Sequence, residues 1–457
     1  MKRSLSEDLE RWLAAEQRRP LVLRGARQVG KTWLVRELAA SQQRELVEIN
    51  FERDPQRARL FQSNDPMKIL GELSLTLGRD IDPRRCLLFL DEIQAAGVVL
   101  AKLRWFYEEL PELPVVAAGS LLEFMLADHD FSMPVGRTTF RHVEPMSFPE
   151  YLQAHGQQRL LEAIAAWRPG ETISEAAHQM AFAWFHRYSM VGGMPAVVEA
   201  DVGRSQPRHC RELQRDIVAT YRADFAKYSG RMDRTILDTV LSSIAASIGG
   251  KFVYSRAGEG VKHHQAKRAL ELLAAARLCH LVRHSTADGT PLGATVKENR
   301  RKAVLLDVGL LHALVGTPAT TAFPGWRTLT PELRGRLSDQ LAGQQLRIVD
   351  GGLGVPSELY YWQREGGRAG EIDYLVQLQG RILPVEIKAG AAGAMKSLHQ
   401  FMFDKRLELA VRCDANPPSE MRVAVKTTRG DDVDYRLVSV PLYMLWNLGK
   451  VAETLWR

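Results

Sequence analysis

The apolar positions of the first 150 residues form short runs separated by amphipathic stretches. The runs at 21–23, 86–90 and 114–119 are mostly apolar, which is typical of strands buried on both faces of a parallel sheet. Residues 33–40 repeat apolar side chains at helical spacing shortly after the first run. Strands that alternate with helices predict a parallel sheet covered on both faces, and we expect this α/β domain to span residues 1–150.

The middle of the chain shows helical spacing instead. From residue 151 to about 228 the pattern is broken at Pro169-Gly170 and at 192–195, and we expect a helical lid or connector over 151–230. Apolar faces at 237–244 and 261–275 then predict two helices, with another helix expected after 251–255. Together with a presumed wing, these helices predict a winged helix-turn-helix over 231–315.

The last part of the chain, 316–457, returns to strands. Residues 371–376 and 382–388 flank a Gln379-Gly380 turn and predict a hairpin. A helix at 395–407, a strand at 421–427 and a helix near 445–456 would complete a small α/β domain.

Composition and charge exclude several classes of protein. The chain has 457 residues, 45% hydrophobic and 25% charged, so it is neither disordered nor fibrous. Its four cysteines form no C-x-x-C pair, and no apolar run is long enough to span a bilayer. We therefore expect a cytoplasmic protein with reduced thiols and no membrane partner. The formal charge of +7 weakly favours polyanionic partners.

The loop after the first strand carries the clearest chemical motif. Residues 25–32 (GARQVGKT) fit G-x-x-x-x-G-K-[ST], between a predicted strand and a predicted helix. Gly25 and Gly30 would leave backbone N–H groups open to a triphosphate, with Gln28 in the same loop. Lys31 would reach the β- and γ-phosphates, and the Thr32 hydroxyl would hold Mg²⁺. ATP and Mg²⁺ are the expected ligands.

Three further segments predict the hydrolytic part of this site. The buried strand at 86–90 ends in Asp91 and Glu92, where Asp91 would bind the Mg²⁺ shell and Glu92 would polarise the attacking water. The strand at 114–119 delivers Ser120 to the same edge, either to sense the γ-phosphate or to cap a helix at 121–126. Arg137 is either a trans-acting finger on a neighbour's nucleotide or an ordinary surface arginine.

Basic side chains gather on the predicted winged helix. The candidates for DNA contact are Lys262, Lys267 and Arg268 on its last helix and Arg300 and Arg301 near its wing. The alternative is a solvated face on a domain used for subunit packing.

Acids and a lysine converge in the C-terminal hairpin. Alternation along the strand puts Glu386 and Lys388 on one face, and Asp373 lies on the partner strand. Two carboxylates that hold Mg²⁺ and a lysine that orients water are what metal-assisted phosphodiester cleavage needs.

Taken in order, these motifs resemble a large family of bacterial and archaeal AAA-class ATPases that are usually labelled ATP-binding proteins. The resemblance covers nearly the whole chain. It rests on residues 25–32, 90–94, 118–122, 136–137, 145–151, 191–195, 302–311 and 384–388. It implies an AAA-type P-loop domain, a helical lid, a winged helix and a C-terminal domain of formerly unknown function.

The C-terminal hairpin also resembles the PD-(D/E)xK nuclease and Holliday-junction-resolvase fold, which makes 316–457 a restriction-endonuclease-like domain. The resemblance implies a third acid from an early helix, and the matching residue is Asp339, where Glu is more common. Ile372 also stands where the pattern has Pro. A degenerate fold used only for DNA binding or packing is the alternative.

The combined expectation is an ATPase that remodels or translocates on duplex or branched DNA, in the extreme case migrating a Holliday junction. Assembly into a homo-oligomeric ring, for example a hexamer, would let Arg137 complete a neighbouring site. Two alternatives stay open: a nucleotide-gated signalling or defence switch without motor activity, and an ATP-dependent nuclease.

Overall fold

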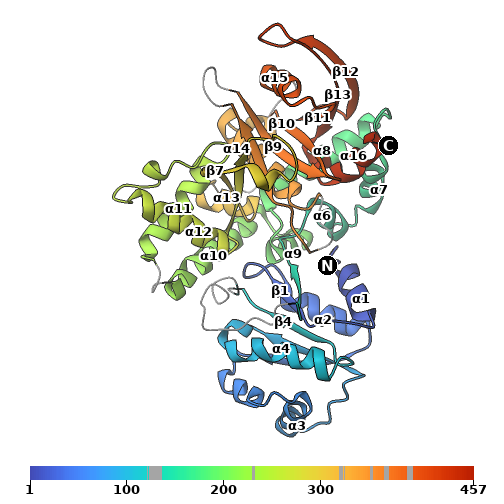
Figure 1. The fold of residues 1–457 in the computed structure, drawn as a ribbon, viewed down its shortest axis with the longest axis vertical. Helices are drawn as coiled ribbons and strands as arrows, with labels where there is room; N and C mark the ends of the chain where they lie inside the picture. The colour runs from blue at the N-terminus through green and yellow to red at the C-terminus, as the bar shows by residue number, and fades with distance from the viewer. Residues whose placement is uncertain are drawn as a thin grey trace. The chain divides into compact units, whose positions relative to one another are not determined.

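The computed structural model describes residues 1–120, 122, 136–228, 232–318, 323, 325–349, 354–364, 370–388 and 395–456. These residues divide into two compact units, each described here by itself (Figure 1). Unit 1 is Met1–Pro145 with the short segments Ala275–Arg277 and Gly352–Val355, and unit 2 is the remainder of the chain. The finer division at 150, 230 and 315 stays a prediction.

Unit 1 is built on a five-stranded parallel sheet in the order β2-β3-β4-β1-β5. The strands are β1 (Leu21–Arg24), β2 (Glu45–Asn50), β3 (Cys86–Asp91), β4 (Val115–Ala118) and β5 (Thr139–His142). The helices are α1 (Ser6–Ala14), α2 (Lys31–Ser41), α3 (Pro66–Leu77) and α4 (Gly97–Glu109), with 3₁₀ turns at Pro55–Phe61 and Ile93–Ala95. The predicted α/β sheet is confirmed; the helix expected at 121–126 lies outside the described residues, apart from Leu122.

Both faces of this sheet are covered. Cys86, Leu88 and Leu90 of β3 pack into a core with apolar residues of α3 and α4. The alternate residues Leu87 and Phe89 are equally buried, on the face of the sheet that α2 covers. The consecutive apolar run in the sequence is therefore explained by burial on two sides.

Unit 2 begins with a set of helices, as expected for the connector. They are α6 (Phe148–Ala154), α7 (Gln158–Ala166), α8 (Glu175–Val191), α9 (Pro195–Val202) and α10 (Pro207–Asp224), followed by a 3₁₀ turn at Phe225–Tyr228. The breaks between α7 and α8 and between α8 and α9 fall where Pro169-Gly170 and residues 192–195 predicted them.

The predicted winged-helix segment contains α11 (Arg234–Ser247), a 3₁₀ turn at Tyr254–Arg256, α12 (His263–Ala275) and the antiparallel strands β6 (Cys279–Ser285) and β7 (Val296–Leu305). The helix expected after residues 251–255 is only that 3₁₀ turn. Strand β6 also pairs in parallel with β8 (Leu359–Gln363), so the β6–β7 hairpin belongs to a larger sheet.

That sheet has eight strands in the order β12-β13-β11-β10-β9-β8-β6-β7 (Figure 1). Its other strands are β9 (Glu371–Leu378), β10 (Arg381–Ile387), β11 (Leu409–Asp414), β12 (Ser419–Lys426) and β13 (Asp432–Pro441). The accompanying helices are α13 (Val308–Leu314), α14 (Pro331–Leu346), α15 (Lys396–Lys405) and α16 (Leu448–Trp456), with 3₁₀ turns at Leu292–Thr295, Trp326–Thr328 and Leu442–Asn447. The predicted β9–β10 hairpin is confirmed.

Asp307, between β7 and α13, joins distant parts of unit 2. Its fully buried carboxylate accepts hydrogen bonds from the N–H groups of Gly193 (2.6 Å) and Gly309 (2.8 Å) and from the side-chain amide of Gln344 (3.1 Å). Burial raises the pKa of Asp307 to about 6, and these donors oppose that rise.

The two glycines of residues 191–195 are needed for this junction. A Cβ on Gly192 would stand 2.1 Å from Oδ1 of Asp307, and one on Gly193 would stand 2.0 Å from the carbonyl oxygen of Met146. Three sequence motifs far apart in the chain therefore meet through close backbone approach.

Among the described residues, the structure contains no helix long and apolar enough to cross a membrane.

We expect Asp307→Asn to lower the free energy of unfolding by about 2–4 kcal/mol, because the amide NH₂ group would face N–H donors inside the core. Urea unfolding followed by circular dichroism measures this loss. The matched control is Asp434→Asn, which removes an exposed partner of Arg422 and should leave stability nearly unchanged. Equal effects of the two substitutions would contradict the role assigned to Asp307.

Candidate functional site

The loop between β1 and α2 has the backbone that a phosphate-binding loop requires. Gly30 has φ 95°, a left-handed conformation that glycine adopts without strain, and it caps the N-terminus of α2. Gln28 also has a positive φ, 64°. The first N–H groups and the positive dipole end of α2 thus face the loop, which suits an anion.

Gly25 serves a different purpose from the one that the motif suggests. With φ +145°, a Cβ there would stand 2.3 Å from the backbone carbonyl oxygen of Val143. The steric need at this position therefore comes from the protein's own backbone, within unit 1. Lys31 is buried, and its Nζ donates to the carbonyl oxygens of Gly25 (2.9 Å) and Ala26 (2.8 Å).

Asp91, at the end of β3, meets the start of α2. Its Oδ2 accepts hydrogen bonds from the Thr32 hydroxyl (3.1 Å) and from the Asn50 side chain (3.2 Å). Burial raises the pKa of Asp91, and the neighbouring Glu92 carboxylate raises it further. A hydroxyl and a carboxylate in an environment that disfavours negative charge suit Mg²⁺, so the residues fit the metal expected with ATP.

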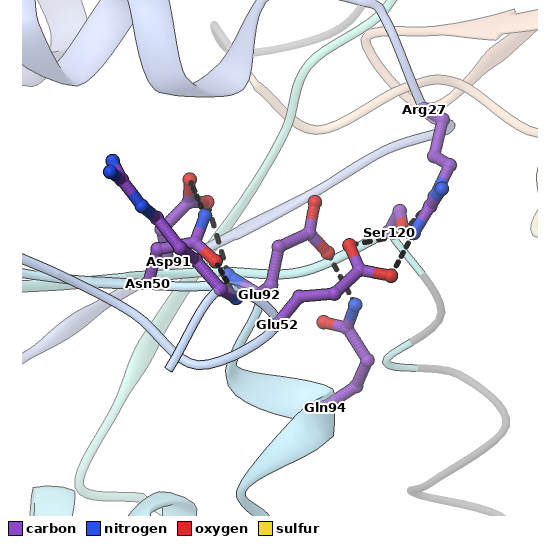
Figure 2. A network of polar contacts seen from close by, with 8 residues as sticks. Arg27, Asn50, Glu52, Asp91, Glu92, Gln94 and Ser120 are labelled. Carbon is purple, nitrogen blue, oxygen red and sulfur yellow. Dashed lines mark hydrogen bonds and ion pairs between the residues drawn. The ribbon is translucent and has the colours of Figure 1, made fainter. Parts of the chain in front are cut away.

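Glu92 follows Asp91 in a left-handed conformation with φ 50°. Its carboxylate accepts a hydrogen bond from the Gln94 side chain, as Figure 2 shows. The Oε1 atom of Gln94 is buried and has no hydrogen-bond partner among the described residues. Beside Glu92 there is therefore a spare acceptor of the kind that can position a water molecule.

Sequence reasoning missed the residues around Ser120. The Arg27 guanidinium lies 2.9 and 3.0 Å from the two carboxylate oxygens of Glu52, and its Nε lies 3.4 Å from Oγ of Ser120 (Figure 2). Glu52 follows β2 closely, as Ser120 follows β4. The rule that selected Asp91 and Ser120, a polar residue after a parallel strand, could have selected Asn50 and Glu52 too.

Arg137, the candidate finger, forms an ion pair with Glu108 of α4 at 2.8 Å. Its side chain is 45% exposed. The arginine is thus at the surface, in contact with its own chain.

The predicted DNA-contact residues of α12 lie as expected for a solvent-facing helix. Lys262, just before the helix, and Arg268 are exposed, and Lys267 is half-buried. Arg300, in β7, is partly exposed. All four cations are thus at least partly exposed to solvent.

Arg301 and Lys302 are placed differently from what the basic run suggested. Both are buried, on opposite faces of β7. Arg301 pairs with Glu271 (3.1 Å) and Glu298 (2.5 Å), which makes it a structural residue and an unsuitable DNA contact. Lys302 forms an ion pair with Glu371.

The side chain of Lys302 lies at the predicted nuclease-like site. Burial alone would lower its pKa, but the carboxylates of Glu371, Asp373 and Asp339 outweigh burial and raise it. We call the four carboxylates that surround this region, those of Asp339, Glu371, Asp373 and Glu386, the acidic cluster. Nothing in the sequence distinguished Lys302 from its basic neighbours.

The predicted convergence on the β9–β10 hairpin is confirmed. Asp373 accepts a hydrogen bond from the backbone N–H of Ile387 (2.7 Å), and Lys388 donates to Glu386 (2.6 Å). Asp339, on α14, is close enough that the charge of Asp373 raises its pKa. The residues named from the sequence thus share one region of unit 2.

A metal site at the acidic cluster is not supported. Among the described residues there is no group of three or more His, Cys, Asp or Glu side chains arranged to hold a metal ion. Ammonium and N–H groups of the protein pair with Glu371, Asp373 and one oxygen of Glu386. The structure thus places Asp339, Asp373 and Glu386 in one region, and their binding of Mg²⁺ stays a prediction.

Three family models match separate parts of this chain. Residues 17–152 match an "AAA domain", residues 183–321 a "Domain of unknown function (DUF8612)", and residues 334–442 a "Domain of unknown function (DUF4143)". Residues 17–152 thus form an AAA-class P-loop ATPase domain. A DUF4143 domain follows it toward the C-terminal end of the chain.

A comparison with curated proteins finds no match. Solved structures with some similarity include PCH-2 from C. elegans, with 12% identity over 43% of this chain and 61% of that one and a TM-score of 0.28. Pif1 helicase from Candida albicans has 15% identity over 40% and 47%, with a TM-score of 0.23. A structure of Drosophila ORC bound to DNA has 16% identity over 68% and 84%, with a TM-score of 0.25. The chain thus spans less than two thirds of the first two of these proteins.

The acidic cluster predicts a pH dependence of stability. Burial, and then the charge of Asp373, raises the pKa of Glu386 to about 7. A raised pKa means that the folded protein binds this proton more tightly than the unfolded chain, so stability falls as pH rises through 7. Glutamine cannot ionise, so Glu386→Gln avoids the electrostatic cost of burying a charged carboxylate. The free energy of unfolding of this variant, relative to that of the wild type, should rise by about 2 kcal/mol between pH 5 and 8.

Urea unfolding at several pH values measures this difference. Glu408→Gln, which removes an exposed carboxylate of the same unit, is the matched control and should show no such trend. If the stability difference between Glu386→Gln and the wild type did not change with pH, folding would not raise the pKa of Glu386.

Proposed function

We propose that this chain hydrolyses ATP and couples hydrolysis to binding and remodelling DNA, or to movement along it, with Holliday-junction migration as the extreme case. The observation that carries the ATPase part is the meeting of Lys31, Thr32, Asp91 and Glu92 at the carboxyl edge of one parallel sheet. This arrangement provides, in one place, the charges that phosphoryl transfer needs.

Each of these residues has a role that its position supports. The loop N–H groups and Lys31 would hold the phosphates, and Thr32 and Asp91 would hold Mg²⁺. When bound, Mg²⁺ supplies positive charge that offsets the charge of the phosphates. Glu92, beside the acceptor atom of Gln94, would orient a water molecule and draw its proton.

The DNA part rests on the cations of unit 2. Lys262, Lys267, Arg268 and Arg300 are accessible, and a helix with such residues suits the phosphate backbone of DNA. Arg301 is left out because it is buried between Glu271 and Glu298. In a ring of identical subunits, Arg137 would act on a neighbour's nucleotide after leaving Glu108.

The ATP-dependent nuclease is the weaker alternative. Phosphodiester cleavage of that kind needs carboxylates that hold Mg²⁺ together, and among the described residues no three such side chains are arranged to hold a metal ion. We therefore assign the DUF4143 region to binding or packing.

We expect Lys31→Ala to lower kcat/KM for ATP by about 100-fold or more, because a preorganised charge on the transferring phosphoryl group is lost. Glu92→Gln should keep ATP binding and lose turnover. Phosphate release measures both rates, and Lys68→Ala, an exposed lysine of α3, is the control that should match wild type. Full turnover by Lys31→Ala would refute the ATPase proposal.

DNA binding is expected to depend steeply on salt. Neutralising Lys262, Lys267 and Arg268 together with alanine should lower the slope of log K against log salt by about 2–3, because each phosphate contact contributes about 0.9. Fluorescence anisotropy with duplex and four-way DNA measures this slope, with Lys426→Ala on β12 as the control. Turnover unaffected by any DNA, with no binding at low salt, would favour the nucleotide-gated switch instead.

A further inference from the structure

We propose that Arg27, inside the phosphate-binding loop, is the residue by which this domain distinguishes ATP from ADP. In the structure its guanidinium is paired with Glu52, and we infer that it exchanges this carboxylate for the terminal phosphate of a bound triphosphate. The inference rests on the proposed ATPase function and adds a specificity-determining residue to it.

The position of Arg27 is the first argument. Its backbone belongs to the loop between Gly25 and Gly30, yet its side chain reaches two other strand ends. Glu52 comes shortly after β2, and Ser120 comes shortly after β4. Strands β2 and β4 are the two neighbours of β3 in the sheet.

The guanidinium is therefore close to the hydrolytic end of the site. Glu92 follows β3, so Glu52, Glu92 and Ser120 follow three adjacent parallel strands at the same edge of the sheet (Figure 2). If Glu92 orients the attacking water, the phosphate that is attacked must lie near this edge. A cation held between Glu52 and Ser120 is then placed for the terminal phosphate rather than for the inner ones.

The chemistry of the present pair favours exchange. Glu52 is 47% exposed, so water and salt screen its attraction to Arg27. A guanidinium forms parallel hydrogen bonds with a phosphate as readily as with a carboxylate, and a terminal phosphate carries more charge. Glu52 is thus a weak partner that a γ-phosphate can replace, whereas ADP offers no such group.

Ser120 gains a role from the same contact. Its hydroxyl lies 3.4 Å from Nε of Arg27, so movement of the guanidinium toward a phosphate changes the surroundings of Ser120. The residue that the sequence indicated as a sensor would then respond through Arg27.

The test compares the affinities of a non-hydrolysable ATP analogue and of ADP, each with Mg²⁺, by isothermal titration calorimetry on the full chain. We expect Arg27→Ala to weaken binding of the ATP analogue by about 10- to 100-fold and binding of ADP by less than about 2-fold. Glu52→Gln removes the negative charge that competes for Arg27. This variant should therefore bind the ATP analogue several-fold more tightly and bind ADP with unchanged affinity.

The neighbouring pair Arg36–Glu48 provides matched controls, because it also joins one guanidinium to both oxygens of one carboxylate, at 2.9 and 2.7 Å, but lies on the surface between α2 and β2. Arg36→Ala and Glu48→Gln should leave the ratio of the two affinities at its wild-type value. Because Glu52→Gln is expected to act in the direction opposite to Arg27→Ala, simple unfolding cannot imitate the pattern.

Two results would overturn the inference. If Arg27→Ala lost equal affinity for the ATP analogue and for ADP, the arginine would only shape the loop. If both affinities were unchanged, the arginine would not contact the nucleotide. In both cases the ATPase proposal stands as long as Lys31→Ala loses turnover. A wild-type protein that binds neither nucleotide would overturn the proposed function itself, and this inference with it.

Discussion

The contact between Asp91 and Thr32 is the constraint on which the nucleotide site depends. It joins the end of a buried strand to the first turn of a helix across 59 positions of sequence. Such a contact requires β1 and β3 to be parallel members of one sheet, since only then do their carboxyl ends meet at one edge. Asp91 and Glu92 repel each other there, and burial increases the cost. A site that holds two carboxylates at such a cost is prepared for a cation.

The second unit also contains buried charged side chains, and several of them pair with other groups of the protein. Lys302 pairs with Glu371, Arg301 with Glu271, and Asp307 with N–H donors, whereas burial raises the pKa of Asp339 and of Glu386 to about 7.

Part of this arrangement was accessible from the sequence. The phosphate loop, the acidic end of β3 and the β9–β10 hairpin each depend on a local pattern, either spacing within a loop or alternation along a strand. Glu52 and Asn50 were equally accessible by the strand-end rule. The burial of Lys302 could not be predicted in this way, because a run of basic residues does not indicate which of them faces a core.

By itself, the sequence determined the class of the first domain and the chemistry of its loop, since Gly30, Lys31 and Thr32 act through backbone conformation and near neighbours. It also predicted β1, β3, β4, β9 and β10, because apolar periodicity reflects burial directly. Only the tertiary structure decided which charges are already paired. Arg27 with Glu52, Arg137 with Glu108 and Lys302 with Glu371 are contacts between segments far apart in the chain. Electrostatic pairing depends on distance and burial in space, and neither is encoded in local spacing.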